Sequence, residues 1–443
     1  MGWMSTTFRP YQPDQMLLLA PDLQEWLPEG HLSHHVSDLV DSLELDAFYA
    51  RYEGDGRRNS PYEPSMMVKV LIYAYATGVF SSRAIARKLE EDVAFRVLAA
   101  GNFPQHRTIC EFRRRHLEDF ERMFVEVVRV AREMGVVRFG TLSVDGTKVR
   151  ANASKRKAMS YGRMLTEETR LKEEIQGLLD RAGAVDEEED ARYGEQVRGD
   201  ELPAELQRRE KRLAAIREAK ERLEAGQREA DDARGRKPGQ RRNPKGGRPY
   251  KRDYGQPDAS AQSNFTDPES QIMNTSSEGF QQCYNAQTVV DQTHQLIVAT
   301  EVEANASDQG RLLPLLDEVS ETFEVEPEVV LADAGYCNEA DLVTLEERDI
   351  DAHVALGREG KARVAADRDR RPATYRMGEK LASAKGKAQY AKRKWLSEAP
   401  NGWIKEVLGF RRFSVRGAHK VRGEWHLVCL ALNIKRMAAL AAC

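Results

Sequence analysis

The sequence is poor in cysteine and has no long apolar run. Its five cysteines, Cys110, Cys283, Cys337, Cys429 and Cys443, form no Cys-x-x-Cys pair, and their number is odd. This argues against a zinc site or a disulfide framework and fits a reduced setting. No apolar run approaches the roughly 18 residues that a membrane-spanning helix needs, and the first residues lack the apolar core of a signal peptide. We therefore expect a cytoplasmic protein with no membrane partner.

The charge of the chain is nearly balanced but unevenly spread. There are 68 Lys and Arg against 71 Asp and Glu, yet residues 234–252 hold nine basic residues and no acidic one. Such a segment cannot bury a core, so we predict a basic disordered linker over 234–253. Its cations would bind DNA phosphates and release counterions. Gly247-Arg248-Pro249 is like the core of a minor-groove-binding AT-hook, which makes Arg248 a candidate DNA contact.

The first 135 residues have the apolar spacing of helices. One helix carries Met66 to Tyr75 and stops at Gly78, and another follows from Ser82. A third helix is basic, and we expect its arginines to be exposed. Three short helices joined by tight turns, with the last one basic, predict a helical N-terminal domain over 1–135 with helix-turn-helix-like DNA binding. A small bundle with a solvated basic face fits the pattern about equally well. The candidate DNA contacts in this domain are Arg107, Arg113 and Arg114.

Residues 161–233 differ from the rest because Glu, Arg, Lys, Leu and Ala dominate them. Apolar residues such as Leu171 and Ile175, or Leu213 and Ile216, recur at helical spacing. The pattern predicts an inserted helical hairpin or coiled-coil arm. Such an arm is either a dimer contact or a solvated protrusion, and the sequence favours neither.

Three carboxylates stand in recognisable settings. Asp145 lies in the apolar run 141–149, Asp333 closes a second run that starts at Val329, and Glu398 lies in a basic, helix-forming stretch. A lone Asp at a strand end is more often a cap than a ligand, so the combination carries the inference. The order of strands and helices predicts an α/β ribonuclease-H-like catalytic domain over 136–160 and 254–443. Asp145 would then lie on the central strand and Asp333 at the end of the neighbouring parallel strand, and the carboxyl ends of such strands are the usual position of a site.

Hard oxygen ligands of this kind suit Mg²⁺ or Mn²⁺. Two such ions can clamp the attacking and the leaving oxygen of a phosphodiester. We therefore expect two metal ions in one active site, held by Asp145, Asp333 and Glu398, and a reaction that cuts and joins nucleic acid.

These residues and their surroundings resemble the DDE transposases of bacterial insertion sequences, in the group with a Tyr-Arg-Glu-Lys signature. The signature here is Tyr390, Arg393, Glu398 and Lys405. The matching motifs are Val144-Asp-Gly-Thr-Lys148, Asp267-Pro-Glu-Ser270, Tyr284-Asn-Ala-Gln287, Ala332-Asp-Ala-Gly-Tyr336, Gly409-Phe-Arg-Arg-Phe413 and Gly417-Ala-His-Lys-Val-Arg422. The resemblance covers nearly the whole chain.

The resemblance implies metal-dependent cleavage of double-stranded DNA at terminal inverted repeats and strand transfer into target DNA. It also implies a homodimer or higher oligomer on DNA, associated with the bacterial nucleoid. Tyr390, Arg393 and Lys405 would contact DNA near the cleaved phosphate, and Arg411 and Arg412 would add phosphate-binding charge. Two alternatives stay open. One is a catalytically decayed or domesticated DNA-binding protein, and the other is a nuclease of the same fold without strand transfer.

One motif departs from the family pattern, in which Pro directly follows the glutamate. This chain has Glu398-Ala-Pro-Asn-Gly-Trp403. Pro400 removes a backbone donor, and Asn401-Gly402 favours a turn. We therefore expect the helix to bend or break here, which would take Lys405 off the face of Glu398 and favours the decayed alternative.

Overall fold

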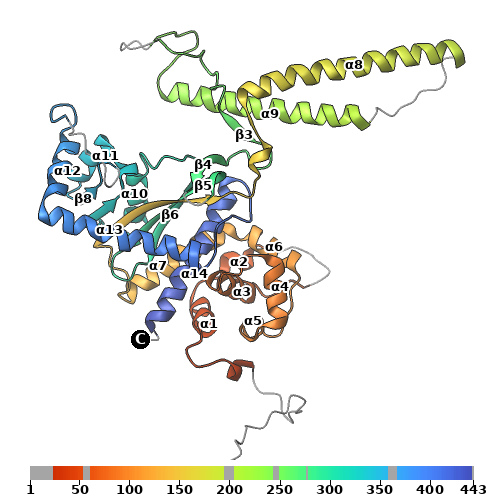
Figure 1. Cartoon of the computed structure of the whole chain (residues 1–443). Helices are drawn as coiled ribbons and strands as arrows, with labels where there is room; N and C mark the ends of the chain where they lie inside the picture. Colours follow the sequence, from red (N-terminus) through yellow and green to blue (C-terminus); the bar gives the residue numbers. More distant parts are fainter. Residues whose placement is uncertain are drawn as a thin grey trace, which may run out of the picture.

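The computed structural model describes residues 23–52, 60–193, 204–242, 249–275, 278–357 and 367–441. It shows a group of N-terminal helices, an α/β part built on one mixed sheet, and a long arm of two helices that projects from the rest (Figure 1). Among the described residues, no helix is both long and apolar enough to cross a membrane.

The N-terminal helices pack around α3 (Pro64–Ala76). This helix is apolar on nearly all sides, so it is buried along most of its length. By contrast, α7 (Leu117–Glu133) has one apolar face, with Phe120, Phe124 and Val127 buried. Residues 1–22 of the expected domain lie outside the described residues. The other elements of this part are η1 (Leu23–Trp26), α1 (Leu32–Ser42), α2 (Asp46–Ala50), α4 (Ser82–Glu91), α5 (Val93–Leu98) and α6 (His106–Arg115).

One mixed sheet forms the centre of the α/β part. Its strands follow the order β6 (Ile297–Glu303), β5 (Gly279–Asp291), β1 (Thr141–Arg150), β7 (Val329–Ala332) and β8 (Asp351–Val354). The short strand β4 (Gln271–Thr275) pairs with the start of β5. β1 is antiparallel to β5 but parallel to β7, and β7 is parallel to β8. The carboxyl ends of β1, β7 and β8 therefore point the same way.

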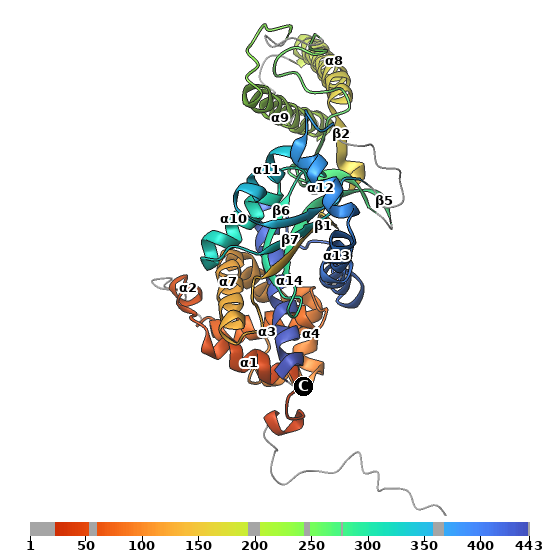
Figure 2. The same cartoon turned by 90° about the vertical axis from the view of Figure 1, so that its left-hand side faces the viewer.

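Helices cover both faces of this sheet. α13 (Ala384–Gly402) packs on β1 and β5, and the view of Figure 2 shows α10 (Leu312–Phe323) and α7 on the opposite side. α14 (Ala418–Ala441) is buried against β6, α7 and α3, so it ties the N-terminal helices to the sheet. α11 (Glu339–Glu347) and α12 (Pro372–Ala382) stand beside β8.

α13 does not break at Pro400. The helix runs through Pro400 to Gly402 and continues as a π-helical turn, η4 (Trp403–Val407). Leu396 and Pro400 are buried against the sheet side, and this packing outweighs the loss of one backbone donor. In the π-helical turn that follows the proline, the N–H of Leu408 donates to the carbonyl of Trp403, five residues earlier. The expected bend or break is therefore wrong.

The arm consists of α8 (Tyr161–Tyr193) and α9 (Ala204–Ala233), and residues 194–203 between them lie outside the described residues. The short strands β2 (Ala158–Ser160) and β3 (Gln262–Asn264) pair at its base, next to η2 (Lys155–Lys157). Apolar side chains join the two helices near this base: Met159, Met164, Leu171, Leu213, Ile216 and Ala219.

The basic segment after α9 makes more contacts than the sequence predicts. Arg236 is buried, pairs with Asp231 at 3.3 Å and lies 4.1 Å from the ring centre of Tyr250. Its guanidinium also donates to the carbonyl of Arg252 at 2.5 Å. These contacts hold Arg236 between α9 and the segment around Tyr250, so residues 234–242 and 249–253 differ from the expected disorder. Gly247 and Arg248 lie outside the described residues.

Candidate active site

Asp145 and Asp333 lie at neighbouring positions of the sheet. Val144 of β1 is paired with Ala332 of β7, and each Asp is the next residue in its chain segment. β7 ends there, and Asp333 caps the short helix η3 (Ala334–Tyr336) by accepting the N–H of Gly335 at 2.7 Å. The two carboxylates, 188 positions apart in the chain, are thus brought to one edge by a parallel strand pair.

The surroundings of Asp145 make its negative charge costly. Its side chain is 17% exposed. Burial raises the pKa of Asp145 to about 6, Arg393 opposes this, and the charge of Asp333 adds to it. A carboxylate with a raised pKa beside a second carboxylate is stabilised by any cation that binds between them.

The side of α13 that faces the sheet carries a row of polar residues at four-residue intervals. Arg393 lies 3.5 Å from an oxygen of Asp145, and Ser397 is hydrogen-bonded to Ser143. Asn401 donates to Asp145 at 3.3 Å, and Lys405 donates to a backbone carbonyl of β1, that of Lys148, at 2.9 Å. Burial lowers the pKa of Lys405. The row therefore places Arg393, Asn401 and Lys405 along β1 near Asp145. Tyr390 lies about one turn before Arg393 and is half-buried.

Glu398 lies apart from this row. It follows Ser397 directly, so it is turned by about 100° around the helix axis, and it is exposed. Within the described part of the chain, no three His, Cys, Asp or Glu side chains are close enough together to hold a metal ion. Of the three predicted ligands, the structure brings Asp145 and Asp333 together and leaves Glu398 on the outer side of α13.

Sequence reasoning missed a set of residues that surround the pair. Asn285 and Gln287 of β5 both donate their amides to Asp308, each at 2.7 Å. Gln287 also accepts a hydrogen bond from the Tyr336 hydroxyl. Asn285 and Gln287 alternate along one strand and therefore face the same side. Their spacing within the motif Tyr284-Asn-Ala-Gln287 was the available signal, whereas no motif of the sequence marked Asp308.

Two glycines make room for Asp308. A Cβ at Gly146 would lie 2.7 Å from one carboxylate oxygen of Asp308, and a Cβ at Gly335 would lie 2.8 Å from the other. At either position a Cβ would force the Asp308 side chain to move. Asp308 therefore packs directly over the backbone that follows Asp145 and Asp333, and the two glycines permit this close approach.

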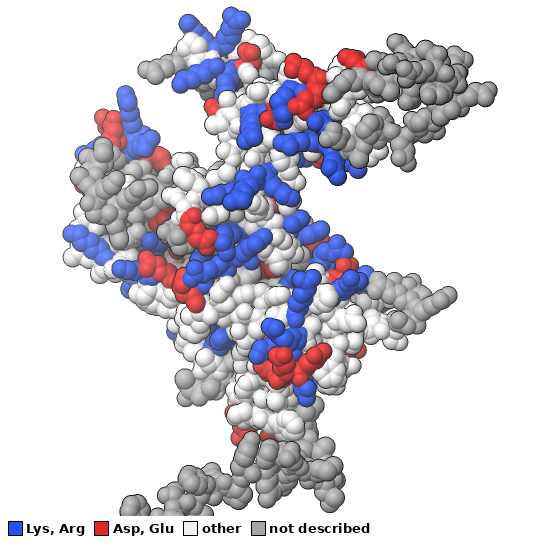
Figure 3. Space-filling view, turned by 45° about the vertical axis from the view of Figure 1, so that its right-hand side comes forward, with Lys and Arg blue, Asp and Glu red and all other residues white. Residues whose placement is uncertain are grey.

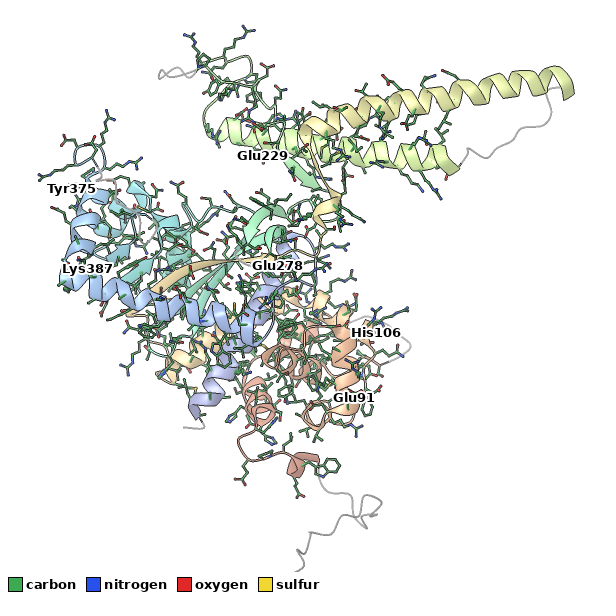
Figure 4. All side chains as sticks on the ribbon, viewed as in Figure 1. Glu91, His106, Glu229, Glu278, Tyr375 and Lys387 are labelled. Atoms are coloured by element: carbon green, nitrogen blue, oxygen red, sulfur yellow. The ribbon has the colours of Figure 1, made fainter. Side chains whose placement is uncertain are left out.

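A basic cavity of about 400 Å³ opens beside the pair. Its cations are Lys148, Arg150, Lys405 and Arg411, and Gly146 and Asp308 also line it. Arg150 pairs with Glu278, which Figure 4 labels by the sheet, and Arg411 pairs with Glu406. Arg412 is exposed and donates to Asn152 at 2.8 Å. Figure 3 shows Lys and Arg gathered across the face below the arm.

The predicted DNA contacts of the N-terminal helices fall into two groups. Arg107 and Arg114 are exposed on α6. Arg113 is only 4% exposed, and it donates to the Tyr75 hydroxyl at 3.1 Å and to the carbonyl of Phe80 at 2.7 Å. Its guanidinium is enclosed by α3 and the loop after it, so the expectation that Arg113 is exposed for contact with DNA is wrong.

Two family models match the chain. Residues 21–115 match a transposase domain (DUF772), and residues 230–434 match a transposase DDE domain. The two matches support a transposase family for this chain. The DDE match contains Asp333 and Glu398, and Asp145 lies between the two matched segments. A transposase DDE domain implies a ribonuclease-H-like fold, and the mixed sheet of this chain agrees with it. Neither the search of curated proteins nor the search of solved structures found a match.

Proposed function

We propose that the protein cuts DNA at the terminal inverted repeats of an insertion sequence and transfers the cut strand into target DNA. The observation that carries the proposal is the placement of Asp145 and Asp333. Asp145 lies in the middle of β1, where its pairing with β7 ends, and Asp333 directly follows β7, beside a basic cavity, in a chain that matches a transposase DDE domain.

The residues at this edge fit a divalent cation. Asp145 and Asp333 offer hard oxygens, and Mg²⁺ or Mn²⁺ needs only one or two carboxylates because water and substrate phosphate complete its shell. We assign two ions to the site, with Glu398 as the third carboxylate. Since Glu398 is exposed and does not contact Asp145, its participation requires α13 to turn or shift. When bound, the ions would activate the attacking oxygen and stabilise the leaving one.

The protein's own side chains would position the DNA strand. Lys148, Arg150, Lys405 and Arg411 line the cavity beside Asp145, where they would neutralise phosphates on either side of the cleaved bond. Without DNA, Arg393 would compensate the negative charge of Asp145. When DNA binds, its guanidinium would pair with a phosphate instead. Tyr390 and Arg412 flank this path in the proposal.

The remaining predicted contacts would hold the ends of the element. Arg107 and Arg114 of the proposed helix-turn-helix-like region would bind the terminal repeats, with Arg248 and its basic neighbours adding phosphate contacts. The arm formed by α8 and α9 would join two copies on DNA. The site of action would be the nucleoid in a bacterial cytoplasm.

The test is cleavage of a labelled duplex that carries the DNA flanking the gene, with Mg²⁺. The wild type should cut at the repeat end, and Asp145→Asn and Asp333→Asn should lose cleavage while DNA binding stays nearly intact. Strong cleavage by either variant would contradict the assignment. The Glu398→Gln variant tests only the third ligand, because cleavage at the wild-type rate would remove Glu398 from the set.

A second candidate function is DNA binding without catalysis. The exposed position of Glu398 favours it, since no third acidic ligand stands by the pair among the described residues. Binding without cleavage by the wild type would select this candidate. Cleavage without joined product in the same reaction would instead select a nuclease that lacks strand transfer.

A further inference from the structure

Asn401 is the side chain of α13 most closely associated with Asp145. It is 6% exposed, and its amide nitrogen donates to Asp145 at 3.3 Å and to the Thr288 hydroxyl at 3.5 Å. Its amide oxygen is buried and has no hydrogen-bond partner within the described part of the chain. The amide nitrogen of Asn401 thus contacts the active site, while the amide oxygen has no hydrogen-bond donor among the described residues.

A buried oxygen without a donor is costly, and such atoms are rare in native proteins. A second such atom lies beside the same carboxylate, because Arg393 Nη1 is buried, lies 3.5 Å from Asp145 and has no hydrogen-bond partner among the described residues. The other two polar residues of the same helix row are satisfied, as Ser397 bonds Ser143 and Lys405 bonds a carbonyl. The two buried polar atoms of the row that lack a hydrogen-bond partner therefore both belong to residues that contact Asp145.

A divalent cation would satisfy the oxygen. Amide oxygens of Asn are hard, neutral ligands for such ions. The carboxylates at this edge supply negative charge, but no third His, Cys, Asp or Glu among the described residues is close enough to complete a site. Building on the proposed function, we propose that Asn401 supplies a neutral oxygen ligand to the divalent cation held by Asp145 and Asp333.

The local structure explains why this residue is available. The helix stays intact through Pro400, so Asn401 falls four residues after Ser397 on the side that faces the sheet. A break in the helix at Pro400 would have taken Asn401 away from Asp145. The alternative role for Asn401 is that of a positioning residue, in which its nitrogen holds Asp145 and its oxygen never meets a cation.

The decisive experiment replaces the oxygen by sulfur and uses Cd²⁺, which binds thiolates strongly. The full-length Asn401→Cys variant should show a saturable thiolate-to-Cd²⁺ charge-transfer band beyond that of the wild type, whose own cysteines set the baseline. Ser397→Cys is the matched control, one turn earlier on the same face, and should show no extra band. No extra band in Asn401→Cys, or equal bands in both variants, would overturn the proposal.

A second measurement covers the case in which the cysteine variant does not fold. Mn²⁺ affinity, read from the signal of free Mn²⁺ in electron paramagnetic resonance, should fall roughly tenfold or more in Asn401→Leu and stay unchanged in Ser397→Ala. Wild-type affinity in Asn401→Leu would overturn the ligand role. If the wild type cleaves DNA while the Asn401 variants bind metal normally, this inference alone fails. If the wild type neither cleaves DNA nor binds Mn²⁺, the proposed function fails with it.

Discussion

Two basic helices, α6 and α13, each turn one arginine toward the protein, and the two arginines have different surroundings. Arg113 of α6 is 4% exposed and makes hydrogen bonds to Tyr75 and to Phe80. The side chain of Arg393 in α13 is 17% exposed and is 3.5 Å from Asp145. The first arginine is enclosed by the core, whereas the second stands at the edge of the sheet where the two carboxylates meet.

The difference lies in what completes each site. The Tyr75 hydroxyl that accepts from Arg113 donates in turn to Glu424 at 2.8 Å, and Glu424 also accepts the N–H of Ser414 at 2.7 Å. This network joins α3, α6 and α14 inside the core, where the Nε of Arg113 is the atom without a hydrogen-bond partner among the described residues. Around Asp145, buried polar atoms of Arg393 and Asn401 lack hydrogen bonds among the described residues. We assign a structural role to the network of Arg113, Tyr75 and Glu424, and we place the chemistry at Asp145. We call the first the closed network and the second the open site.

The largest expected effect is on catalysis at the open site. Asp145→Asn keeps the size of the side chain but removes the charge that a cation needs, so cleavage should fall by roughly a thousandfold or more. The measurement is single-turnover cleavage at saturating protein. Arg114→Ala, which lies far along the chain from the carboxylates, serves as the control and should cleave at near the wild-type rate once it is bound.

The closed network predicts the largest loss of stability. Arg113→Met leaves buried Glu424 without its nearby cation, and the free energy of unfolding should fall by about 3–5 kcal/mol. The same substitution at exposed Arg114 should change it by less than about 0.5 kcal/mol. Urea denaturation of both variants makes the comparison, and equal losses would contradict the burial of Arg113.

The raised pKa of Asp145 predicts a gain in stability from the same Asp145→Asn substitution. Because the pKa in the folded state is raised to about 6, the stability associated with the neutral carboxyl is present below about pH 4 and is lost as the pH rises through about 6. Asp145→Asn avoids this loss. It should be more stable than the wild type by about 1–3 kcal/mol at pH 8 and equal to it near pH 4. Thermal denaturation without divalent ions measures this, and a variant less stable at pH 8 would contradict it.

The smallest expected effect concerns DNA affinity. Arg107 and Arg114 are exposed on α6, so replacing either by Ala should weaken binding to the repeat duplex a few-fold and lower the salt slope by about one. Salt titration by fluorescence anisotropy gives both numbers. An unchanged slope for both variants would remove α6 from the DNA-binding surface.

The sequence was informative where local pattern decides the structure. One apolar run that contains Asp145 and a second that ends at Asp333 were enough to predict that the two Asp lie on neighbouring parallel strands. It failed where distant packing decides. The burial of Arg113 depends on Glu424, which comes about 300 positions later, and a helix pattern does not show which face another helix will cover. Pro400 suggested a break because the buried packing that holds the helix together is invisible in the sequence.

The polar shell of the site was equally hidden. No sequence motif marked Asp308, whose carboxylate accepts from Asn285 and Gln287 of β5 and lies against the glycines that follow the two carboxylates. Asn401 was taken as a turn residue beside Gly402, whereas the intact helix places it against Asp145.

The most direct test of the account is Mg²⁺-dependent cleavage of a duplex that carries the flanking terminal repeat, with wild type and Asp333→Asn side by side. The account predicts a cut at the repeat end by the wild type and none by the variant, with both proteins binding the duplex equally. Equal cleavage by the two proteins would contradict the central claim that Asp145 and Asp333 form the catalytic pair.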